Sequence, residues 1–442
     1  MNKNLKPSIK TRKPVSVNTY MKRFLTKEKI KCLNDCYYLI RDKKESRSFI
    51  EQMQIKEDAV FDSLFPLVSL VIFTANKIEC DALAFSMAEI EKCPSFKRKN
   101  PLPIIENAKY LCPDAYIYNW QSSYILHLHA VETGAFTPGG SSDLTRYIVN
   151  HTLIKPNCIL SFGICYGRNY KEQNLGDVII PRKLYPWSIA QKIDQKSCKI
   201  KSDNYNIALD QFFHRSELFT TLREYCNDAD GRVIDCDLPG KKGKTIHLST
   251  FVRMGSMSTG EAVVSSSDAK KAIIEANRND QELGGEMEAY GIAKECTVYA
   301  NLPCFIIKSI CDWGEKKNID DALNNSGMTP PDHLKDKLQA YAAFCAGVIL
   351  LGVLKENPCF FFSLSALGKM VDYQSYDKSK IIRWLKKHYS VDDNSANEIF
   401  ALLKNNRILF PSDDNSATQD KYYKKRFVKN KKGDIAKDNY LP

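Results

Sequence analysis

Two glutamates flank a methionine in GGEMEAYGIAKE, residues 284–295, where a helix is expected to begin. A pair of carboxylates can serve as general acid and general base. However, residues i and i+2 point to opposite sides of a strand and to nearly opposite sides of a helix, so Glu286 and Glu288 are not expected to face each other. We therefore predict separate roles. One such role is structural, because a carboxylate at a helix N-terminus contributes about 0.3–1 kcal/mol of stability.

Other candidate acids follow buried strands. Glu79 comes just after the β-branched run SLVIFTA, residues 69–75, and Asp312 follows IIKSI, residues 306–310. Ligands of open α/β sheets bind beyond the carboxyl ends of the strands. We therefore predict that Glu79, Glu288 and Asp312, although far apart in the sequence, line one crevice.

The elements that position these acids alternate between strands and helices. Short apolar runs typical of buried strands are separated by segments with helical periodicity, which indicates an α/β sheet covered on both faces. The strands are expected at residues 69–75, 115–120, 124–133, 157–167, 176–188, 247–257 and 302–315. The apolar run at residues 340–354 is shorter than the ~20 residues that a membrane span requires, so we interpret it as a buried helix.

The pattern changes after Pro358. Three short helices are expected at residues 365–373, 378–390 and 395–406, and a hairpin from RILFP to KYYKKRFV follows across a polar turn. Three helices and a β wing predict a winged-helix-like module. The predicted organisation is a basic extension of unassigned function at 1–62, the α/β domain at 63–357, the winged-helix-like module at 358–428 and a basic tail at 429–442.

The formal net charge of the 442 residues is +12, and it is concentrated in two segments. Residues 1–31 have a balance of +9 and residues 421–433 a balance of +7, which leaves −4 for the remainder. Such basic segments contact nucleic acid or anionic surfaces in some proteins and are solvated tails in others, and both interpretations stay open. Fifteen scattered cysteines without a C-x-x-C pair, and no signal peptide, predict a reduced cytoplasmic protein.

Four segments together resemble the nucleoside phosphorylase and nucleosidase superfamily. They are IFTANKIECDAL, SFGICYGRNYKEQNLGDVIIP, GEMEAYGIA and IIKSICDWGEKKN, in that order within residues 65–357. The likeness is strongest to methylthioadenosine/S-adenosylhomocysteine nucleosidases, and a second likeness is to phosphorylase-like domains fused to other modules in bacterial and fungal receptor or defence proteins. The resemblance implies a phosphorylase-like three-layer α/β domain with a mixed central sheet, and an enzyme that cleaves the N-glycosidic bond of a purine nucleoside.

The resemblance also implies roles for the acids. Glu288 would bind the ribose 2′- and 3′-hydroxyls, with Met287 packing on the sugar and Glu286 left with a structural role. Asp312 would protonate the leaving base at N7, or stabilise its protonation. Glu79 would orient and deprotonate the attacking water while the sugar becomes oxocarbenium-like. For each acid the alternative is a local role in a loop or at a helix end.

Two apolar stretches complete the site that the resemblance implies. Gly163 and Ile164 of SFGICYG would lie beside the ribose and the nucleophile. Val263 and Val264 of EAVVSSSD would pack on the purine, although valine offers less stacking area than the aromatic residue often found at the first of these positions.

The nucleophile is expected to be water. Hexameric phosphorylases of the superfamily hold phosphate with an arginine and a serine, and the aligned positions here are Ser161 and Ile164, which offer no fixed positive charge. An arginine can still arrive from elsewhere, for example Arg168 or Arg253, so phosphorolysis stays open as an alternative.

Two further motifs have competing interpretations. TPGGSSDLTRY, residues 137–147, can bind a substrate's 5′-phosphate through backbone N–H groups, or Ser141, Ser142 or Asp143 can simply be an N-cap. His127 and His129 share one strand face, but no third metal ligand is apparent, so packing or hydrogen bonding is favoured. No metal or organic cofactor is expected.

The favoured function is therefore a purine nucleosidase that acts by hydrolysis on a nucleoside or nucleotide. The first alternative is a phosphorylase of the same fold. The second is a nucleoside-sensing regulator whose C-terminal module binds nucleic acid, or a protein partner. By resemblance we expect a homo-oligomer, a dimer, and no association with a membrane.

Overall fold

The computed structural model describes most of the predicted α/β domain and part of the C-terminal module. The described residues are 17–41, 68–93, 95–99, 114–120, 123–129, 134–135, 140–151, 154, 156–187, 192–194, 199–201, 206–212, 217–228, 230–240, 243–261, 264, 267–276, 282–300, 302–314, 332–356, 376–389, 393–394, 396–397, 400–401, 409–411 and 421–424.

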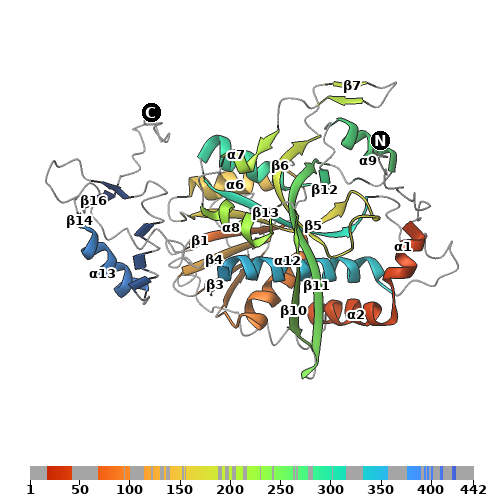
Figure 1. Ribbon diagram of the computed structural model, residues 1–442, viewed down its shortest axis with the longest axis horizontal. Helices are drawn as coiled ribbons and strands as arrows, with labels where there is room; N and C mark the ends of the chain where they lie inside the picture. Colours follow the sequence, from red (N-terminus) through yellow and green to blue (C-terminus); the bar gives the residue numbers. More distant parts are fainter. Residues whose placement is uncertain are drawn as a thin grey trace, which may run out of the picture.

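A mixed sheet forms the centre of the molecule (Figure 1). Its strands are β1 (Val68–Thr74), β2 (Ser95–Lys99), β3 (Asp114–Trp120), β4 (Ser123–His129), β5 (Cys158–Gly167), β6 (Val178–Pro186), β9 (Ile207–Ala208), β10 (Arg232–Pro239), β11 (Thr245–Thr259), β12 (Glu282–Glu286) and β13 (Cys304–Asp312). The order is β10-β11-β6-β13-β5-β1-β4-β3-β2, with β12 paired to β11 and β5, and β9 paired to β6. The predicted mixed α/β sheet is therefore confirmed.

The middle of this sheet closes on itself. Strand β11 pairs with β6, β6 with β13, β13 with β5, β5 with β12, and β12 with β11. The strands β1, β5 and β13 are mutually parallel, so their carboxyl ends meet at one rim. Their burial is nearly complete along their length, as expected for strands covered on both faces.

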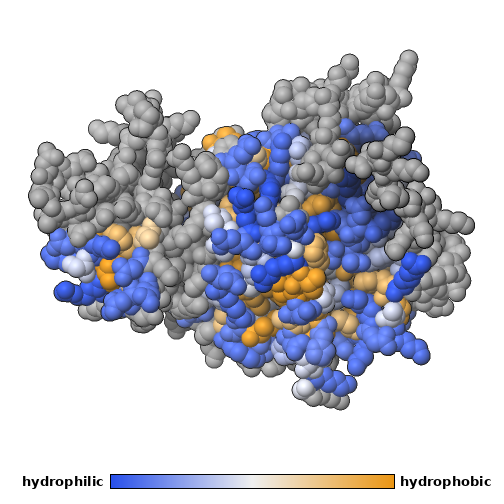
Figure 2. Space-filling model, viewed as in Figure 1, coloured by the Kyte–Doolittle hydropathy of each residue, from blue (hydrophilic) through white to orange (hydrophobic). Residues whose placement is uncertain are grey.

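Helices lie on both sides of the central strands (Figure 1). They are α1 (Val17–Phe24), α2 (Lys27–Arg41), α5 (Lys77–Phe85), the π-helix η2 (Ser86–Ile90), α6 (Ser141–Asn150), α7 (Leu209–Phe212), α8 (Glu217–Tyr225), α9 (Ser267–Ala276), α10 (Ala289–Lys294), the π-helix η5 (Glu295–Ala300) and α12 (Leu334–Glu356). Figure 1 shows α2 and α12 on one side and α6 and α7 on the other. Figure 2 shows a largely hydrophilic coloured surface on this face, with apolar patches near its centre.

The long apolar helix α12 is a core helix. By length and composition it is able to cross a membrane, but 89% of its most apolar window is buried inside the protein. It packs against α2, α5 and β13. This confirms the interpretation of residues 340–354 as a buried helix.

The N-terminal helices belong to the same core. Met21 and Leu25 of the α1 region, and Leu33, Cys36 and Leu39 of α2, are buried in the cluster that also contains the strands β1, β5 and β13. The sequence places these helices in a basic extension that ends at residue 62. The structure shows that this extension contributes apolar side chains to the α/β domain.

The C-terminal module is described only in part. A short antiparallel sheet has the order β14-β16-β15, from β14 (Tyr376–Asp377), β16 (Lys421–Lys424) and β15 (Leu409–Pro411). Helix α13 (Lys378–Tyr389) follows β14 and buries Ile381 and Leu385. The hairpin and the helix at 378–390 agree with the sequence prediction. The first predicted helix, at 365–373, lies outside the described residues, and so does most of the third.

Two strands of a separate small sheet complete the described elements. They are β7 (Lys192–Asp194) and β8 (Lys199–Lys201), which pair in antiparallel fashion.

Candidate active site

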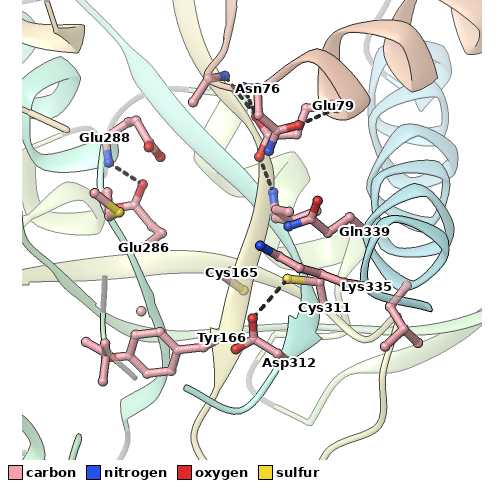
Figure 3. Close-up of a pocket in the computed structure, with 16 residues that line it drawn as sticks. Asn76, Glu79, Cys165, Tyr166, Glu286, Glu288, Cys311, Asp312, Lys335 and Gln339 are labelled. Carbon is pink, nitrogen blue, oxygen red and sulfur yellow. Dashed lines mark hydrogen bonds between the residues drawn. The ribbon is translucent and has the colours of Figure 1, made fainter. Parts of the chain in front are cut away.

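A cavity of about 260 Å³ opens at the rim where β1, β5 and β13 end. Figure 3 shows its lining: Glu79 lies at one end, Asp312 and Tyr166 at the other, with Glu286 and Glu288 on one side and the α12 side chains opposite them. The strand-end argument predicts this meeting of distant acids. The full lining is Ala75, Asn76, Glu79, Ile164, Cys165, Tyr166, Val264, Gly285, Glu286, Met287, Glu288, Cys311, Asp312, Lys335, Leu338 and Gln339.

Glu79 is held in the first turn of α5 by backbone donors. Asn76 caps the helix by accepting the Glu79 N–H at 2.9 Å, and Glu79 Oε2 accepts the N–H groups of Ala75 and Asn76 at 2.8 and 3.2 Å. This is a capping box built with asparagine and glutamate. Glu79 Oε1 accepts the N–H of Ile164 at 2.9 Å, which ties α5 to β5.

The environment of Glu79 favours proton uptake. The side chain is 1% exposed, and burial raises its pKa, helped by Glu288 and opposed by Lys308 and the backbone donors. A carboxylate oxygen can accept more than one hydrogen bond, so Glu79 Oε1 can still accept a hydrogen bond from a group in the cavity. Gly163 allows the close approach, because a Cβ there would lie 2.3 Å from Glu79 Oε1, and its φ of +154° also favours glycine.

Glu286 and Glu288 surround one buried cation. Lys308 Nζ lies 3.0 Å from Glu288 Oε2 and 3.4 Å from Glu286 Oε2. Burial alone lowers the pKa of Lys308, but Glu288, Glu286 and Glu79 raise it above its usual value, so the amine stays charged. Two residues that regular geometry keeps apart thus reach the same lysine, because the chain changes from β12 to α10 between them.

Glu286 bonds to the backbone at the start of α10, which agrees with the structural role that the resemblance implies for it. Its Oε2 accepts the N–H groups of Glu288 and Ala289, each at 2.8 Å, at the start of α10. Burial raises the pKa of Glu286, while Lys308 opposes the rise. The Glu288 side chain is left directed to Lys308 and the cavity, with Met287 beside it.

Asp312 ends β13 at the opposite end of the cavity. Its Oδ1 accepts the N–H of Gly314 at 2.7 Å, and the Cys311 thiol lies 3.6 Å from Oδ2. Burial raises the pKa of Cys311, and Asp312 adds to the rise, so this thiol stays protonated and unsuited to nucleophilic attack.

An apolar wall adjoins Asp312. Tyr166 packs with Val264 and Ile273, and Trp187 covers this cluster. The ring of Tyr166 lies against Gly285, where a Cβ would be 2.3 Å from the hydroxyl. This wall offers a flat surface for a heterocyclic base. Val263, predicted to share this wall, lies outside the described residues.

Helix α12 supplies the remaining wall. Lys335, Leu338 and Gln339 from its first turns line the cavity, and Figure 3 shows Lys335 and Gln339 directed into it. Lys335 has no ion pair with another described residue. Neither Arg168 nor Arg253 lines this cavity, nor does Ser161.

The serines of residues 137–147 do not have the predicted roles. The N-cap of α6 is Gly140, without a side-chain cap, so the prediction that Ser141, Ser142 or Asp143 caps this helix is wrong. The Ser141 hydroxyl donates to Glu288 O at 2.6 Å and the Ser142 hydroxyl to Glu295 Oε1 at 2.8 Å, which joins α6 to α10 and η5. Their N–H groups donate to the carbonyls of Gly134 and Ala135, so these four donors are not available to a phosphate.

The histidines of β4 are both buried. His127 hydrogen-bonds Thr74 Oγ1 at 2.9 Å and Tyr118 Oη at 3.0 Å through its two ring nitrogens. Burial lowers the pKa of His127 well below its usual range and that of His129 to about 4. Among the described residues, no group of three or more His, Cys, Asp or Glu side chains is arranged to hold a metal ion.

Three residues at this site were not predicted from the sequence. Lys308 lies in the middle of an apolar strand, and the only signal was a lone charge in IIKSI. Tyr166 and Lys335 carried no distinguishing signal, because their place in the cavity depends on how β5 and α12 pack.

Several solved nucleosidase structures are similar to this chain. The methylthioadenosine/S-adenosylhomocysteine nucleosidase from Neisseria meningitidis matches 65% of this chain and 99% of its own, with 16% identity and a TM-score of 0.42. The futalosine hydrolase of Helicobacter pylori matches 66% and 98%, with 14% identity and a TM-score of 0.43. The Helicobacter pylori methylthioadenosine/S-adenosylhomocysteine nucleosidase matches 66% and 99%, with 13% identity and a TM-score of 0.44.

These enzymes are of the kind that the sequence motifs resemble. At such identities and TM-scores the similarity carries no conclusion about activity or substrate, which must come from the cavity itself. No protein-family model matches the chain, and no curated protein sequence matches it.

Proposed function

We propose that this protein is a purine N-glycosidase that hydrolyses the bond between base and ribose. The observation that carries the proposal is the distribution of acids around one cavity: Glu79 at one end, Glu288 on one side and Asp312 beside the apolar wall of Tyr166 at the other end. A cavity lined by acids stabilises a sugar that becomes cationic as its base departs.

Each acid then has a distinct task. The purine packs on Tyr166 and Val264, where Asp312 donates a proton to the ring nitrogen of the leaving base. Glu288, anchored by Lys308, accepts hydrogen bonds from two ribose hydroxyls and places negative charge near the developing cation. Glu79 accepts a proton from the water that attacks the anomeric carbon, and its raised pKa supports this role.

Water fits this cavity better than phosphate as the nucleophile. Four carboxyl groups line it, from Glu79, Glu286, Glu288 and Asp312. Lys308 already pairs with Glu286 and Glu288, and the other lysine, Lys335, lies on the α12 wall of the cavity. A phosphate dianion beside Glu79 would meet like charges in a partly desolvated place.

Product identity tests the proposal. Purified protein is given adenosine, methylthioadenosine, inosine and AMP, each with and without phosphate, and the products are separated by chromatography. We expect free base and free sugar, or sugar 5-phosphate from AMP, at equal rates in both conditions. A sugar 1-phosphate formed only with phosphate would establish a phosphorylase instead.

The α12 wall bears on the choice between nucleoside and nucleotide. With the base on Tyr166 and the 2′- and 3′-hydroxyls on Glu288, the C5′ substituent remains to face Lys335 and Gln339. A cation and an amide bind a 5′-phosphate better than they bind an apolar C5′ substituent. We expect kcat/KM for AMP to exceed that for adenosine, and the ratio of the two to fall about tenfold in Lys335→Ala, the loss of one charge-assisted hydrogen bond. A kcat/KM for adenosine at or above that for AMP would make the nucleoside the substrate, and a ratio that does not respond to this substitution would show that Lys335 does not contact the phosphate.

A further inference from the structure

Helix α1 reaches the turn that carries Asp312. The ring of Tyr20 meets the indole of Trp313 edge to face, with centroids 4.6 Å apart. Trp313 directly follows Asp312 and is 2% exposed, and its side chain does not line the cavity. The contact therefore lies behind the active site and joins residue 20 to the chain segment of the proposed acid.

Tyr20 is itself held at a fixed position. Its hydroxyl accepts the N–H of Leu175 at 3.3 Å and donates to Asn174 Oδ1 at 3.4 Å, and its ring stacks on Phe24 with centroids 5.9 Å apart. The loop that binds the hydroxyl also pairs with β13. Gly176 N–H donates to Ile310 O at 2.8 Å, and Ile310 N–H donates to Asp177 O at 2.9 Å.

The turn is held from a second direction as well. Lys270 of α9, itself buried, donates from Nζ to Trp313 O at 2.8 Å. Within the turn, the N–H of Gly314 fixes the Asp312 carboxyl. A displacement of Trp313 therefore moves the donor that orients this carboxyl.

We propose that Tyr20 is a positioning residue for Asp312, so that the N-terminal helix is part of the catalytic apparatus. This inference rests on the proposed nucleosidase function. Without the Tyr20 ring, Trp313 loses its packing partner on α1, and the carboxyl is less well aligned with the leaving base. A misplacement of about 1 Å is enough to slow a reaction about 100-fold.

The test separates base protonation from the rest of catalysis. Purine release requires a proton from Asp312, whereas nitrophenolate is a good leaving group and departs from p-nitrophenyl riboside without one. We expect Tyr20→Leu to lower kcat for the purine substrate about 10- to 100-fold with little change in KM. The rate with p-nitrophenyl riboside should stay within about threefold of wild type, since a general fold defect would lower both rates.

Two variants of α1 serve as controls. Arg23→Gln changes an exposed side chain of the same helix, so its purine rate should stay near that of wild type. Tyr20→Phe keeps the ring against Trp313 and loses only the hydroxyl, so it should retain most of the activity. In an Asp312→Asn background, Tyr20→Leu should add no further loss of purine release.

The outcomes distinguish the two proposals. If the wild-type protein cleaves neither substrate, the nucleosidase function itself is wrong. If the wild type is active but Tyr20→Leu leaves purine release intact, or lowers both rates equally, the positioning role is overturned.

Discussion

Lys308 is the residue on which the charge balance of the cavity depends. It is 1% exposed and lies within hydrogen-bonding distance of Glu288 Oε2 and close to Glu286 Oε2. Carboxylates so placed repel each other and have given up much of their hydration. The lysine offsets both effects, and its pairing with Glu288 Oε2 keeps that carboxylate in place beside the cavity.

Removal of this cation is expected to destabilise the fold. Lys308→Met leaves the buried carboxylate of Glu286 and the partly buried carboxylate of Glu288 without their partner, and removal of one partner of a buried ion pair costs about 3–5 kcal/mol. Thermal unfolding of the purified variant measures the loss. Lys335→Met is the matched control, because this lysine is exposed and has no ion pair with another described residue, so it should change stability by less than about 0.5 kcal/mol. Equal melting temperatures for Lys308→Met and wild type would show that the cation is not needed.

The pH dependence of activity should report Glu79. Burial raises its pKa above the usual glutamate value of 4.5, so a higher pH is needed to ionise it. A general base must be ionised to accept a proton, and kcat/KM should therefore rise with pH through this raised pKa. In Glu79→Gln the residual rate should lose this acidic limb, whereas Glu286→Gln should keep it. An acidic limb that persists unchanged in Glu79→Gln would assign the base to another group.

Among single residues, the sequence predicts the cavity acids that follow strands, but it does not predict the residues that contact those acids. Glu79 and Asp312 were found because they directly follow apolar runs, and strand ends meet at one rim. The expectation that Glu286 and Glu288 do not face each other assumed a regular backbone, whereas both reach Lys308 where β12 gives way to α10. The link from Tyr20 to Trp313 spans almost 300 residues of sequence, and no local pattern signals it.

Among the elements, the junction of α5 and β5 determines the position of Glu79. Helix α5 begins so close to β5 that the Glu79 carboxylate lies against the backbone of Gly163 and accepts the N–H of Ile164. The two elements are thus joined through the proposed base itself. Any side chain at position 163 must displace it.

A single methyl group at this junction should impair catalysis. In Gly163→Ala the new Cβ would lie 2.3 Å from Glu79 Oε1, so the carboxylate must move, and we expect kcat to fall about 10- to 100-fold. Gly243→Ala is the control, because that glycine also has a positive φ, +72°, but no atom lies within 4 Å of its Cβ position. Both rates are measured with the same purine substrate. Full activity of Gly163→Ala would show that Glu79 need not be held in this position.

The sequence predicts most of these elements but not how they are joined. Periodicity identifies β1, β5, β13 and α12, because each is a long apolar run. It does not identify the hydrogen bonds from Ser141 and Ser142 to α10 and η5. A serine near the start of a helix can cap that helix or bond to another element, and the local sequence does not distinguish the two. The closed ring of strands also depends on pairing between distant segments.

For the whole molecule, Asp177 should make stability depend on pH. Burial raises its pKa to about 6, against 3.8 for an exposed aspartate, although the Asn174 N–H and the charges of Arg253 and Lys29 oppose the rise. The folded protein therefore binds this proton more tightly than the unfolded chain does. Its stability falls as pH rises between about 4 and about 6, and the loss is complete above that range.

Asp177→Asn should remove this contribution, since the amide oxygen can still accept the N–H of Asn174. We measure the melting temperature of the variant minus that of wild type. We expect this difference to be roughly 2–6 °C larger at pH 7 than at pH 4.5. Differential scanning calorimetry at the two pH values measures the difference. A constant offset between the two proteins would mean that Asp177 does not titrate differently on unfolding.

In the whole molecule, the N-terminal helices and the C-terminal module both lie outside the central sheet. The N-terminal helices are predicted as an extension, yet they share the domain core, because amphipathic helices alone do not reveal what covers their apolar face. The sequence of helix α13 contains Lys378, Lys380, Arg383, Lys386 and Lys387 and no acidic residue. Binding of nucleic acid or a protein by the C-terminal module stays a prediction.

The central claim is that Asp312 protonates a purine as its glycosidic bond breaks. The most direct measurement is the rate of free-base release from AMP and adenosine by wild type and Asp312→Asn, with Asp143→Asn as a control for an exposed acid on α6. We expect the Asp312→Asn rate to fall about 10²- to 10⁴-fold and the Asp143→Asn rate to stay near wild type. Base release by Asp312→Asn at the wild-type rate would contradict the account.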